Sequence, residues 1–387
     1  MNRIYLDQAS TSFPKAPGVA QAMMDYLTMN GVNVNRGCYS SAYSAEEVIY
    51  ETRQLLAELF HFSKCKNVIF TPNVTTSLNF ILKGFLKPGD HILVSAMEHN
   101  AVMRPVVQLA SSRISFDRIP CRTNGSMILE KVEELIRPET KAIVTLHASN
   151  VCGTRMPLDA LGEICQRHQL YFVVDSAQTA GILPINMDKM HIDALAFTGH
   201  KGLRGPQGTG GFLVSQELAE QMEPLISGGT GSVSHTEEIP DFMPDRFESG
   251  TPNLPGIYGL HEALLYLKTH SLQAINEKEL SLTGYFLEQL QALDDTGSHI
   301  RIIGKKDLTD RNAVVSIQTP EIDMSQVAWQ LDNEYGVMTR VGLHCAPNAH
   351  KTLGTYPAGT IRFSFGPENT KNELDFAIQG LKKILDL

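Results

Sequence analysis

Lys201 has a setting in the sequence that suits chemistry better than a place on the surface. It follows a short apolar run and His200, and the residues after it are rich in glycine and proline, as in "AFTGHKGLRGPQGTGGFLV" at 196–214. The apolar run predicts a strand, and the glycines permit a tight turn directly behind it. A solvated lysine needs neither feature, whereas an amine that attacks a carbonyl has to be held in place. The pattern therefore favours Lys201 as an amine nucleophile.

Polar side chains follow each of five successive apolar runs in this part of the chain. Ligands of open α/β sheets bind beyond the carboxyl ends of the strands, so we expect these side chains to meet at one edge. Each alone has an ordinary interpretation, since Thr75 or Asp175 suits a helix cap and His99 a solvated histidine. Their recurrence favours one shared site. The residues are Thr75, Thr76, Glu98, His99, Asn100, His147, Asn150, Asp175, Gln178, Thr198, His200 and Lys201.

One ligand could use all of these residue types. Hydroxyls at a helix N-terminus bind a phosphate, and an imidazole can stack on an aromatic ring. An aspartate can keep a pyridine nitrogen protonated, and a lysine amine can form a Schiff base with an aldehyde. Phosphate, aromatic ring, pyridine nitrogen and aldehyde together describe pyridoxal 5′-phosphate (PLP). The residues therefore predict a PLP site at the strand ends.

Alternating strands and helices must position these side chains. Continuous apolar runs are typical of buried parallel strands, and 74–86 and 157–168 have helical character between them. The run at 208–215 follows the glycines so closely that an antiparallel strand is expected there. Beyond about residue 255 the rhythm changes to long helices with few strands. Strands are predicted at 67–70, 91–95, 141–146, 170–175, 194–198, 313–318 and 359–365, and helices at 256–270, 275–293 and 372–385.

This rhythm predicts the α/β fold class with two unequal parts. A large PLP-binding domain is expected at 13–255, with a mostly parallel sheet of the seven-stranded type covered by helices. Glycine- and proline-bearing loops at 228–255 then lead to a smaller α+β C-terminal domain at 256–387, which also takes residues 1–12.

The composition of the chain argues against nucleic acids and membranes as binding partners. The chain has 387 residues, a formal net charge of −9 and no basic cluster, which argues against nucleic acid as its main partner. No apolar run is long enough for a membrane span and "MNRIYLDQAS" lacks a signal-peptide core, so no membrane contact and a cytoplasmic location are expected. The cysteines are scattered without a CxxC pair, which indicates neither disulfides nor a metal site. They are Cys38, Cys65, Cys121, Cys152, Cys165 and Cys345.

The ordered motifs of the chain resemble those of the class V aminotransferase-like group of fold-type I PLP enzymes. Within this group the chain is most similar to the cysteine desulfurases and selenocysteine lyases, nearly from end to end. The motifs are "YLDQASTSFP" (5–14), "NVNRGCYS" (33–40), "FTPNVTTSLN" (70–79), "MEHNA" (97–101), "HASNVCGT" (147–154), "VVDSAQTAG" (173–181), "TGHKGLRGPQGTGGF" (198–212), "FESGTPN" (247–253) and "TRVGLHCAP" (339–347).

The resemblance implies a role for each candidate residue. Lys201 binds the cofactor aldehyde, Asp175 pairs with the pyridine nitrogen and Gln178 with the ring hydroxyl. His99 stacks on the ring and moves protons, and Asn150 lies near the ring and the substrate. The remaining implied contacts are Thr75, Thr76, Thr198 and His200 for the phosphate, Thr251 for the phosphate of the neighbouring subunit in a homodimer, and Arg362 with Arg340 for the substrate carboxylate.

Cys345 is the residue that distinguishes a desulfurase from the other enzymes of this group. The stretch "RVGLHCA" resembles the "RxGxHCA" loop of the desulfurases, in which the thiol attacks the sulfur of the substrate. A buried packing role is the ordinary alternative, but "GLHCAP" is polar and turn-like, and His344 or Arg340 could lower the pKa of an exposed thiol. Lys201, His99 and Cys345 are therefore the expected catalytic residues.

The predicted function is a PLP-dependent cysteine desulfurase. It would convert L-cysteine to L-alanine, keep the sulfur on Cys345 as a persulfide and pass it to an acceptor protein or thiol. Selenocysteine lyase is the first alternative, and an aminotransferase, an epimerase or a C–S lyase would need Lys201 but no thiol. A non-catalytic binding module is disfavoured because Lys201, Asp175 and Arg362 are all in place.

Overall fold

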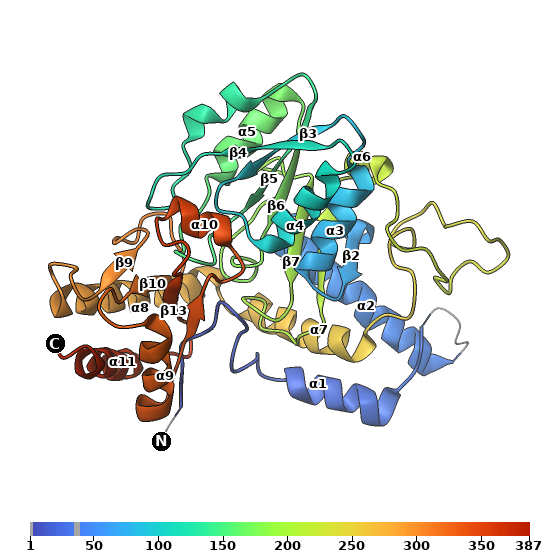
Figure 1. Cartoon of the computed structure of the whole chain (residues 1–387). Helices are drawn as coiled ribbons and strands as arrows, with labels where there is room; N and C mark the ends of the chain where they lie inside the picture. The colour runs from blue at the N-terminus through green and yellow to red at the C-terminus, as the bar shows by residue number, and fades with distance from the viewer. Residues whose placement is uncertain (1–2, 35–38) are drawn as a thin grey trace.

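The structure is a computed structural model that describes residues 3–34 and 39–387. Cys38 and most of the "NVNRGCYS" motif therefore lie outside the described residues. Two sheets dominate the chain, a large one at the centre and a small one beside it, and both chain termini lie on the side of the small sheet (Figure 1).

The large sheet has seven strands and is mostly parallel, as predicted. Only β8 runs antiparallel to its two neighbours, β2 and β7, which confirms the expectation for the run after the glycines. The order across the sheet is β2 (Val68–Thr71), β8 (Gly210–Val214), β7 (Ala194–Thr198), β6 (Tyr171–Asp175), β5 (Thr140–Leu146), β3 (His91–Ser95) and β4 (Ser115–Ile119).

Helices cover both faces of this sheet because successive side chains of a buried strand point to opposite sides. Leu93, for example, packs with α2, α5 and α7, whereas its neighbours Ile92 and Val94 pack with α3, α4 and α6. A further helix, α1, packs on α7. The bounds are α1 (Val19–Asp25), α2 (Ser40–Leu59), α3 (Val74–Phe85), α4 (Asn100–Ala110), α5 (Leu158–His168), α6 (Gln216–Gln221) and α7 (Leu254–Thr269).

The small sheet is antiparallel and packs against helices through a core of its own. Its order is β12 (Arg340–Gly342), β13 (Thr360–Ser364), β10 (Val314–Gln318) and β9 (Arg301–Ile303). Near it, β1 (Ile4–Tyr5) pairs in parallel with β11 (Val337–Met338), so both ends of the chain contribute to this part. The helices here are α8 (Leu272–Leu293), α9 (Met324–Tyr335), α10 (Pro347–Thr352) and α11 (Lys371–Ile384).

The core side chains bear on where the two parts divide. Leu260 and Leu264 of α7 pack in the core of the large sheet, whereas Leu282 and Phe286 of α8 pack in the core of the small one. Ile275, near the start of α8, still packs in the core of the large sheet, so we propose that the change of domain falls within α8. The predicted division after residue 255 stays a prediction.

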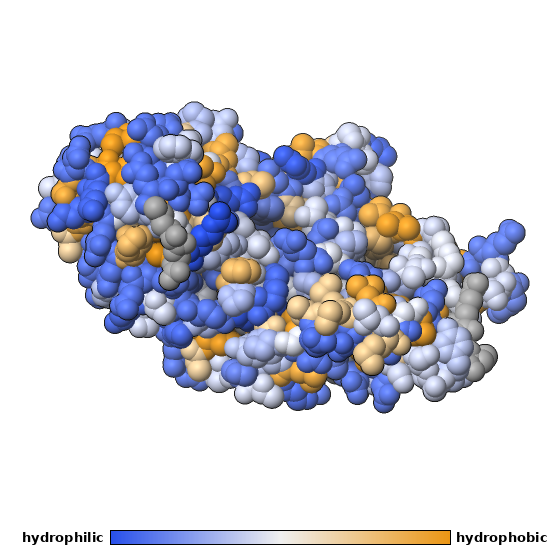
Figure 2. All heavy atoms as spheres, turned by 90° about the horizontal axis from the view of Figure 1, so that it is seen from below, coloured by the Kyte–Doolittle hydropathy of each residue, from blue (hydrophilic) through white to orange (hydrophobic). Residues whose placement is uncertain are grey.

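The surface is mixed in character. Figure 2 shows the face that lies at the bottom of Figure 1, where hydrophilic side chains cover most of the molecule and apolar ones gather in separate patches. None of the described helices combines the length and the apolar character needed to cross a lipid bilayer.

Candidate active site

The carboxyl ends of the parallel strands carry most of the candidate residues, as the sequence predicts. Asp175 ends β6, Lys201 lies three residues past β7, and His99 lies between β3 and α4. Asn150 follows β5 and is buried. Because β3, β5, β6 and β7 are parallel neighbours in the sheet, these side chains share one edge.

The Lys201 amine lies in an environment that disfavours its charge. Burial lowers its pKa from 10.5 to about 8, and the nearby charges of Arg362 and Arg340 lower it further, while Asp175 opposes the shift. A neutral amine is therefore much more accessible near neutral pH than for an ordinary lysine. The backbone holds the residue as well, because the Arg204 N–H donates to the Lys201 carbonyl at 2.7 Å.

Asp175 is a buried carboxylate fixed by the backbone. The Ala177 N–H donates to its Oδ1 at 2.9 Å, and its own carbonyl accepts from the His147 N–H at 2.9 Å. Burial raises its pKa, while the Ala177 hydrogen bond and the charge of Lys201 lower it. A cation placed against this carboxylate would be strongly stabilised, since little water screens the pair.

His99 is a neutral imidazole at physiological pH. Its Nδ1 accepts a hydrogen bond from the Ala101 N–H at 3.0 Å as the N-cap of α4, so the ring proton is on Nε2. Burial and the charge of Lys201 lower its pKa to about 4. The ring is thus fixed, uncharged and close to Lys201, which suits stacking and proton transfer through Nε2.

Two buried polar atoms at and just after the end of β7 lack partners among the described residues. Thr198 Oγ1 and His200 Nδ1 are enclosed without a hydrogen-bond partner within 3–34 and 39–387. At the N-terminus of α3 the Thr76 N–H donates to Asn73 Oδ1 at 3.0 Å. A Cβ on Gly210 would lie 2.7 Å from the Asn73 Cα, so only glycine lets β8 approach this turn. Unpaired hydroxyl and imidazole groups beside a helix N-terminus fit a phosphate.

A cavity of about 770 Å³ opens beside this turn. Thr76 and Thr251 both line it, together with apolar side chains that include Phe80 and Phe247. Thr75, in contrast, is exposed, and its carbonyl accepts from the Asn79 side chain at 2.9 Å.

Arg362 lies at the opposite end of the site and is almost completely buried. It donates to Asp7 Oδ1 at 2.8 Å, to Ser10 Oγ at 2.7 Å and to the Asn150 carbonyl at 3.0 Å. Arg340 is its register partner on β12 and donates to the same Ser10 oxygen at 2.9 Å. Two guanidinium groups that meet at one hydroxyl oxygen could together bind a carboxylate.

The loop that carries Cys345 is hydrogen-bonded to residues of this site that are far away in the sequence. The Asn100 N–H donates to the Cys345 carbonyl at 2.8 Å, and the Asn150 side chain donates to the His344 carbonyl at 2.7 Å. His344 and Cys345 both adopt the left-handed backbone conformation, with φ of 47° and 57°. The thiol is exposed, which rules out a buried packing role.

His344 does not act as the cation that the sequence suggested. It is buried, its Nε2 lies 2.9 Å from Thr360 Oγ1, and burial together with the charge of Arg362 lowers its pKa to about 2. The ring is therefore neutral at physiological pH, and the expectation that its charge lowers the thiol pKa is wrong. Arg362 and Arg340 are charged groups close enough to lower the pKa of His344.

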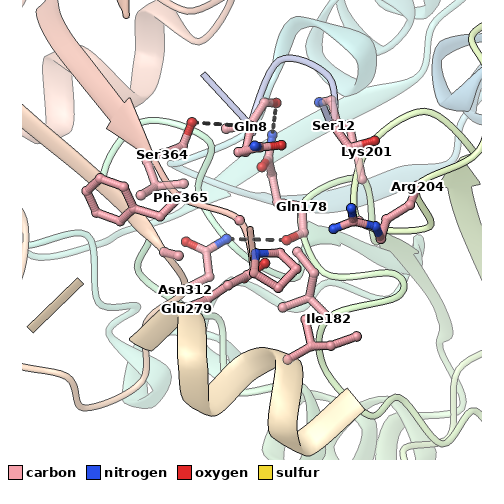
Figure 3. Close-up of a pocket in the computed structure, with 18 residues that line it drawn as sticks. Gln8, Ser12, Gln178, Ile182, Lys201, Arg204, Glu279, Asn312, Ser364 and Phe365 are labelled. Carbon is pink, nitrogen blue, oxygen red and sulfur yellow. Dashed lines mark hydrogen bonds between the residues drawn. The ribbon is translucent and has the colours of Figure 1, made fainter. Parts of the chain in front are cut away.

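Gln178 connects the site to the N-terminal segment. Its side chain donates to the Ala9 carbonyl at 3.1 Å, and its own carbonyl accepts from the Asn312 side chain at 3.3 Å (Figure 3). A small cavity of about 40 Å³ lies here, lined by Lys201, by Gln178 and by the buried acid Glu279. Burial raises the pKa of Glu279 to about 8.

Three residues of the site received no role from the sequence. Asp7 and Ser10 hold Arg362, and only their place in the "YLDQASTSFP" motif marked them. Glu98 is buried beneath His99, accepts from the Leu146 N–H at 2.9 Å and also from Ser95 Oγ, and has its pKa raised to about 8 by burial. Its position after a strand was the only sequence signal.

Comparison with known proteins identifies the class of this site. The profile of the family described as "Aminotransferase class-V" matches residues 4–376, and the chain belongs to this family. Within it, the relatives are named cysteine desulfurases, which confirms the resemblance drawn from the motifs. Class V aminotransferases and cysteine desulfurases are PLP enzymes.

The similarity covers nearly the whole chain. A "Probable cysteine desulfurase" of Halalkalibacterium halodurans is 31% identical, over 98% of this chain and 92% of that protein. One of Staphylococcus aureus is 33% identical, over 98% and 91%. An apo cysteine desulfurase structure from Thermococcus onnurineus superposes with a TM-score of 0.92 at 31% identity, covering 99% of this chain and 95% of that one. The Escherichia coli cysteine desulfurase CsdA has a TM-score of 0.88 at 27% identity, covering 99% and 95%.

Proposed function

We propose that this chain is a PLP-dependent cysteine desulfurase that converts L-cysteine to L-alanine and takes the sulfur onto Cys345. The observation that carries the proposal is the exposed Cys345 thiol, whose loop is held by hydrogen bonds from the Asn100 N–H and the Asn150 side chain to its backbone carbonyls. The names of the relatives support it independently.

The residues fit PLP at both of its ends. Thr198 and His200 offer unpaired side-chain groups for the phosphate, and Asp175 offers a fixed carboxylate for the pyridine nitrogen. When bound, PLP supplies an aldehyde for the amine and an electron sink for the charge that builds up on the substrate. Lys201 supplies the amine, and its lowered pKa keeps a useful fraction of it neutral.

Two arginines form the binding site for the substrate carboxylate. Arg362 and Arg340 bind it, and Ser10, which both guanidinium groups already contact, fixes their orientation. Lys201 takes the Cα proton of the substrate, since an amine of pKa about 8 is an effective base near neutral pH. His99 keeps a proton on Nε2 and can deliver it to the substrate Cβ after the sulfur has left.

Sulfur transfer is the step that uses Cys345. The Cys345 thiolate forms a bond to the substrate sulfur while the bond from that sulfur to Cβ breaks, and the bonding pair stays with carbon. A proton then adds at Cβ, and the proton that Lys201 took is returned to Cα, which gives alanine. The extra sulfur remains on Cys345 as a persulfide, so no external oxidant or reductant is needed.

A homodimer with shared sites is part of the proposal. Met24, Leu27 and Met29 expose 51%, 65% and 78% of their surface near α1, and Ile226 and Phe242 are also exposed in the loops before α7. Clusters of exposed apolar side chains indicate a protein interface. Ile226 and Thr251 line the same cavity as Thr76, so a partner on this face would lie next to the phosphate end. A cytoplasmic location stays a prediction from the sequence.

The test is to supply L-cysteine and a thiol reductant and measure alanine and sulfide together. Cys345→Ala should abolish both, and Cys345→Ser should do the same because its hydroxyl is a poor sulfur nucleophile. Cys65→Ala is the matched control, since Cys65 is partly buried at the far side of α2. Undiminished alanine formation by Cys345→Ala would overturn the proposal, and pyruvate in place of alanine would indicate a simple C–S lyase.

A further inference from the structure

The exposed thiol of Cys345 lies among segments that carry no carboxylates. The sequence from 336 to 366, which includes β12, α10 and β13, contains no Asp or Glu, and neither does 99–116, which includes α4. The chain as a whole has 42 acidic and 33 basic residues. These two segments next to the reactive thiol therefore depart from the charge of the rest of the molecule, and the acid that contacts their arginines, Asp7, comes from the N-terminal segment and pairs with the buried Arg362.

Three of the exposed cations of these segments lie near the thiol loop, whereas the fourth, Arg113, lies beyond the far end of α4. Arg104 lies one turn into α4 from Asn100, whose backbone N–H donates to the Cys345 carbonyl, so Arg104 is close to the end of the helix that contacts the thiol loop. Arg340 and Arg104 both lower the pKa of His99, which shows that their charges act at the same place. Lys351 is on α10, which begins two residues after Cys345, and its Nζ lies 5.2 Å from the centre of the Tyr356 ring.

These cations have no partners of opposite charge. None of the three makes an ion pair with a carboxylate in the described part of the chain, whereas Arg53 and Arg204 elsewhere do. Exposed apolar surface accompanies them, since Val341 is 37% and Tyr356 50% exposed. Unpaired cations with apolar side chains around one reactive atom form a surface that complements a protein of negative charge.

We propose that the sulfur acceptor is a protein whose receiving cysteine is surrounded by Asp and Glu, and that Arg104 and Lys351 guide it to Cys345. This rests on the proposed desulfurase function. The acceptor thiolate attacks the outer sulfur of the Cys345 persulfide, a new S–S bond forms on the acceptor, and the old S–S bond breaks. The bonding pair returns to the Cys345 sulfur as a thiolate, so the electrons balance without another reagent.

The experiment uses the holoenzyme loaded with radiolabelled sulfur from L-cysteine, and peptides with one cysteine as acceptors. Three peptides of equal length place four Glu, four Gln or four Lys around that cysteine, and N-acetylcysteine represents a small anionic thiol. At low ionic strength the Glu peptide should accept sulfur about fivefold faster than the Gln peptide, and the Lys peptide slowest. High salt should remove the differences, because it screens exposed charges.

Charge-neutral variants then test the two residues. R104Q combined with K351Q should bring the rate for the Glu peptide close to that for the Gln peptide, with alanine formation in the presence of dithiothreitol unchanged. K382Q combined with K383Q, two exposed lysines at the end of α11, is the matched control and should change nothing.

Four results would count against the proposal. Equal rates for the three peptides at low salt would overturn it, and so would a Glu-peptide rate that does not respond to the paired variant. If N-acetylcysteine matches the Glu peptide and depends equally on Arg104 and Lys351, the surface serves a small anion and the protein acceptor is wrong. Absence of labelled sulfur on Cys345 before any acceptor is added refutes the desulfurase function itself, and this proposal with it.

Discussion

Replacing Lys201 with methionine should stabilise the cofactor-free protein while it abolishes activity. The pKa of Lys201 is about 8 against an ordinary value of 10.5, so the folded state holds its proton less tightly than the unfolded chain does. At about 1.36 kcal/mol per pKa unit this corresponds to about 3.4 kcal/mol of destabilisation at neutral pH. Lys201 is only half-buried by area, and water screens it, so we expect about 1–2 kcal/mol.

The pH dependence identifies the cause. Below about pH 8 both states are protonated and the full cost is present. Between about pH 8 and 10.5 the unfolded state binds more protons than the folded one, so the stability of the wild type rises with pH through this group. Lys201→Met lacks this contribution. The advantage of the variant should therefore be largest at pH 7 and vanish by about pH 10.5.

The assay is urea unfolding of the cofactor-free proteins at several pH values from 6.5 to about 10, followed by fluorescence. Lys87→Met, in an exposed loop after α3, is the control and should match the wild type throughout. A gain in stability of Lys201→Met that is the same at every pH would refute the electrostatic reasoning, because added apolar contact alone has no pH dependence. No gain at pH 7 would refute it as well.

Three further outcomes follow from the site. Gly210→Ala should weaken PLP binding at least tenfold in a cofactor titration, because its Cβ would lie 2.7 Å from the Asn73 Cα. Gly89→Ala is the control for the backbone strain of a substituted glycine alone, because its Cβ meets nothing within 4 Å. Glu98→Gln should unfold at a higher temperature than the wild type above about pH 8 and lose that advantage towards pH 5. The reason is that burial raises the pKa of Glu98 to about 8, so at high pH the wild type must ionise a buried acid. A difference in unfolding temperature that stays constant with pH would contradict this. Asn150→Ala should accelerate the reaction of Cys345 with iodoacetamide severalfold, since it removes the hydrogen bond to the His344 carbonyl, and an unchanged rate would show that the Asn100 contact suffices.

The sequence predicted the buried strands and the edge strand β2 within a residue or so, but it missed the other edge strand, β4. β3, β5, β6 and β7 are continuous apolar runs, and all four occur within a residue or so of their predicted bounds. β4, "SFDRI", escaped prediction because it is an edge strand with polar and half-exposed side chains. Its pairing with β3 depends on a neighbour that the local pattern does not reveal.

The candidate site shows the same limit. Lys201, Asp175 and His99 could be found because each follows a strand, and the topology of the sheet brings such positions together. The contacts of Asp7 with Arg362, and of Asn100 with Cys345, join residues hundreds of positions apart. No local pattern encodes them, and the neutral state of His344 follows from burial, which the polar sequence around it concealed.

The union of both chain ends in the small sheet has a consequence for synthesis on the ribosome. The Leu6 N–H donates to the Met338 carbonyl, the Ser364 N–H donates to the Leu6 carbonyl, and Asp7 pairs with Arg362. The N-terminal segment leaves the ribosome first, yet its partners are among the last residues to be made. A nascent chain must therefore wait for about residue 364 before the binding site for the substrate carboxylate can close. An unfinished chain therefore has Lys201 but lacks the assembled site for the substrate carboxylate. We expect such a chain to be inactive.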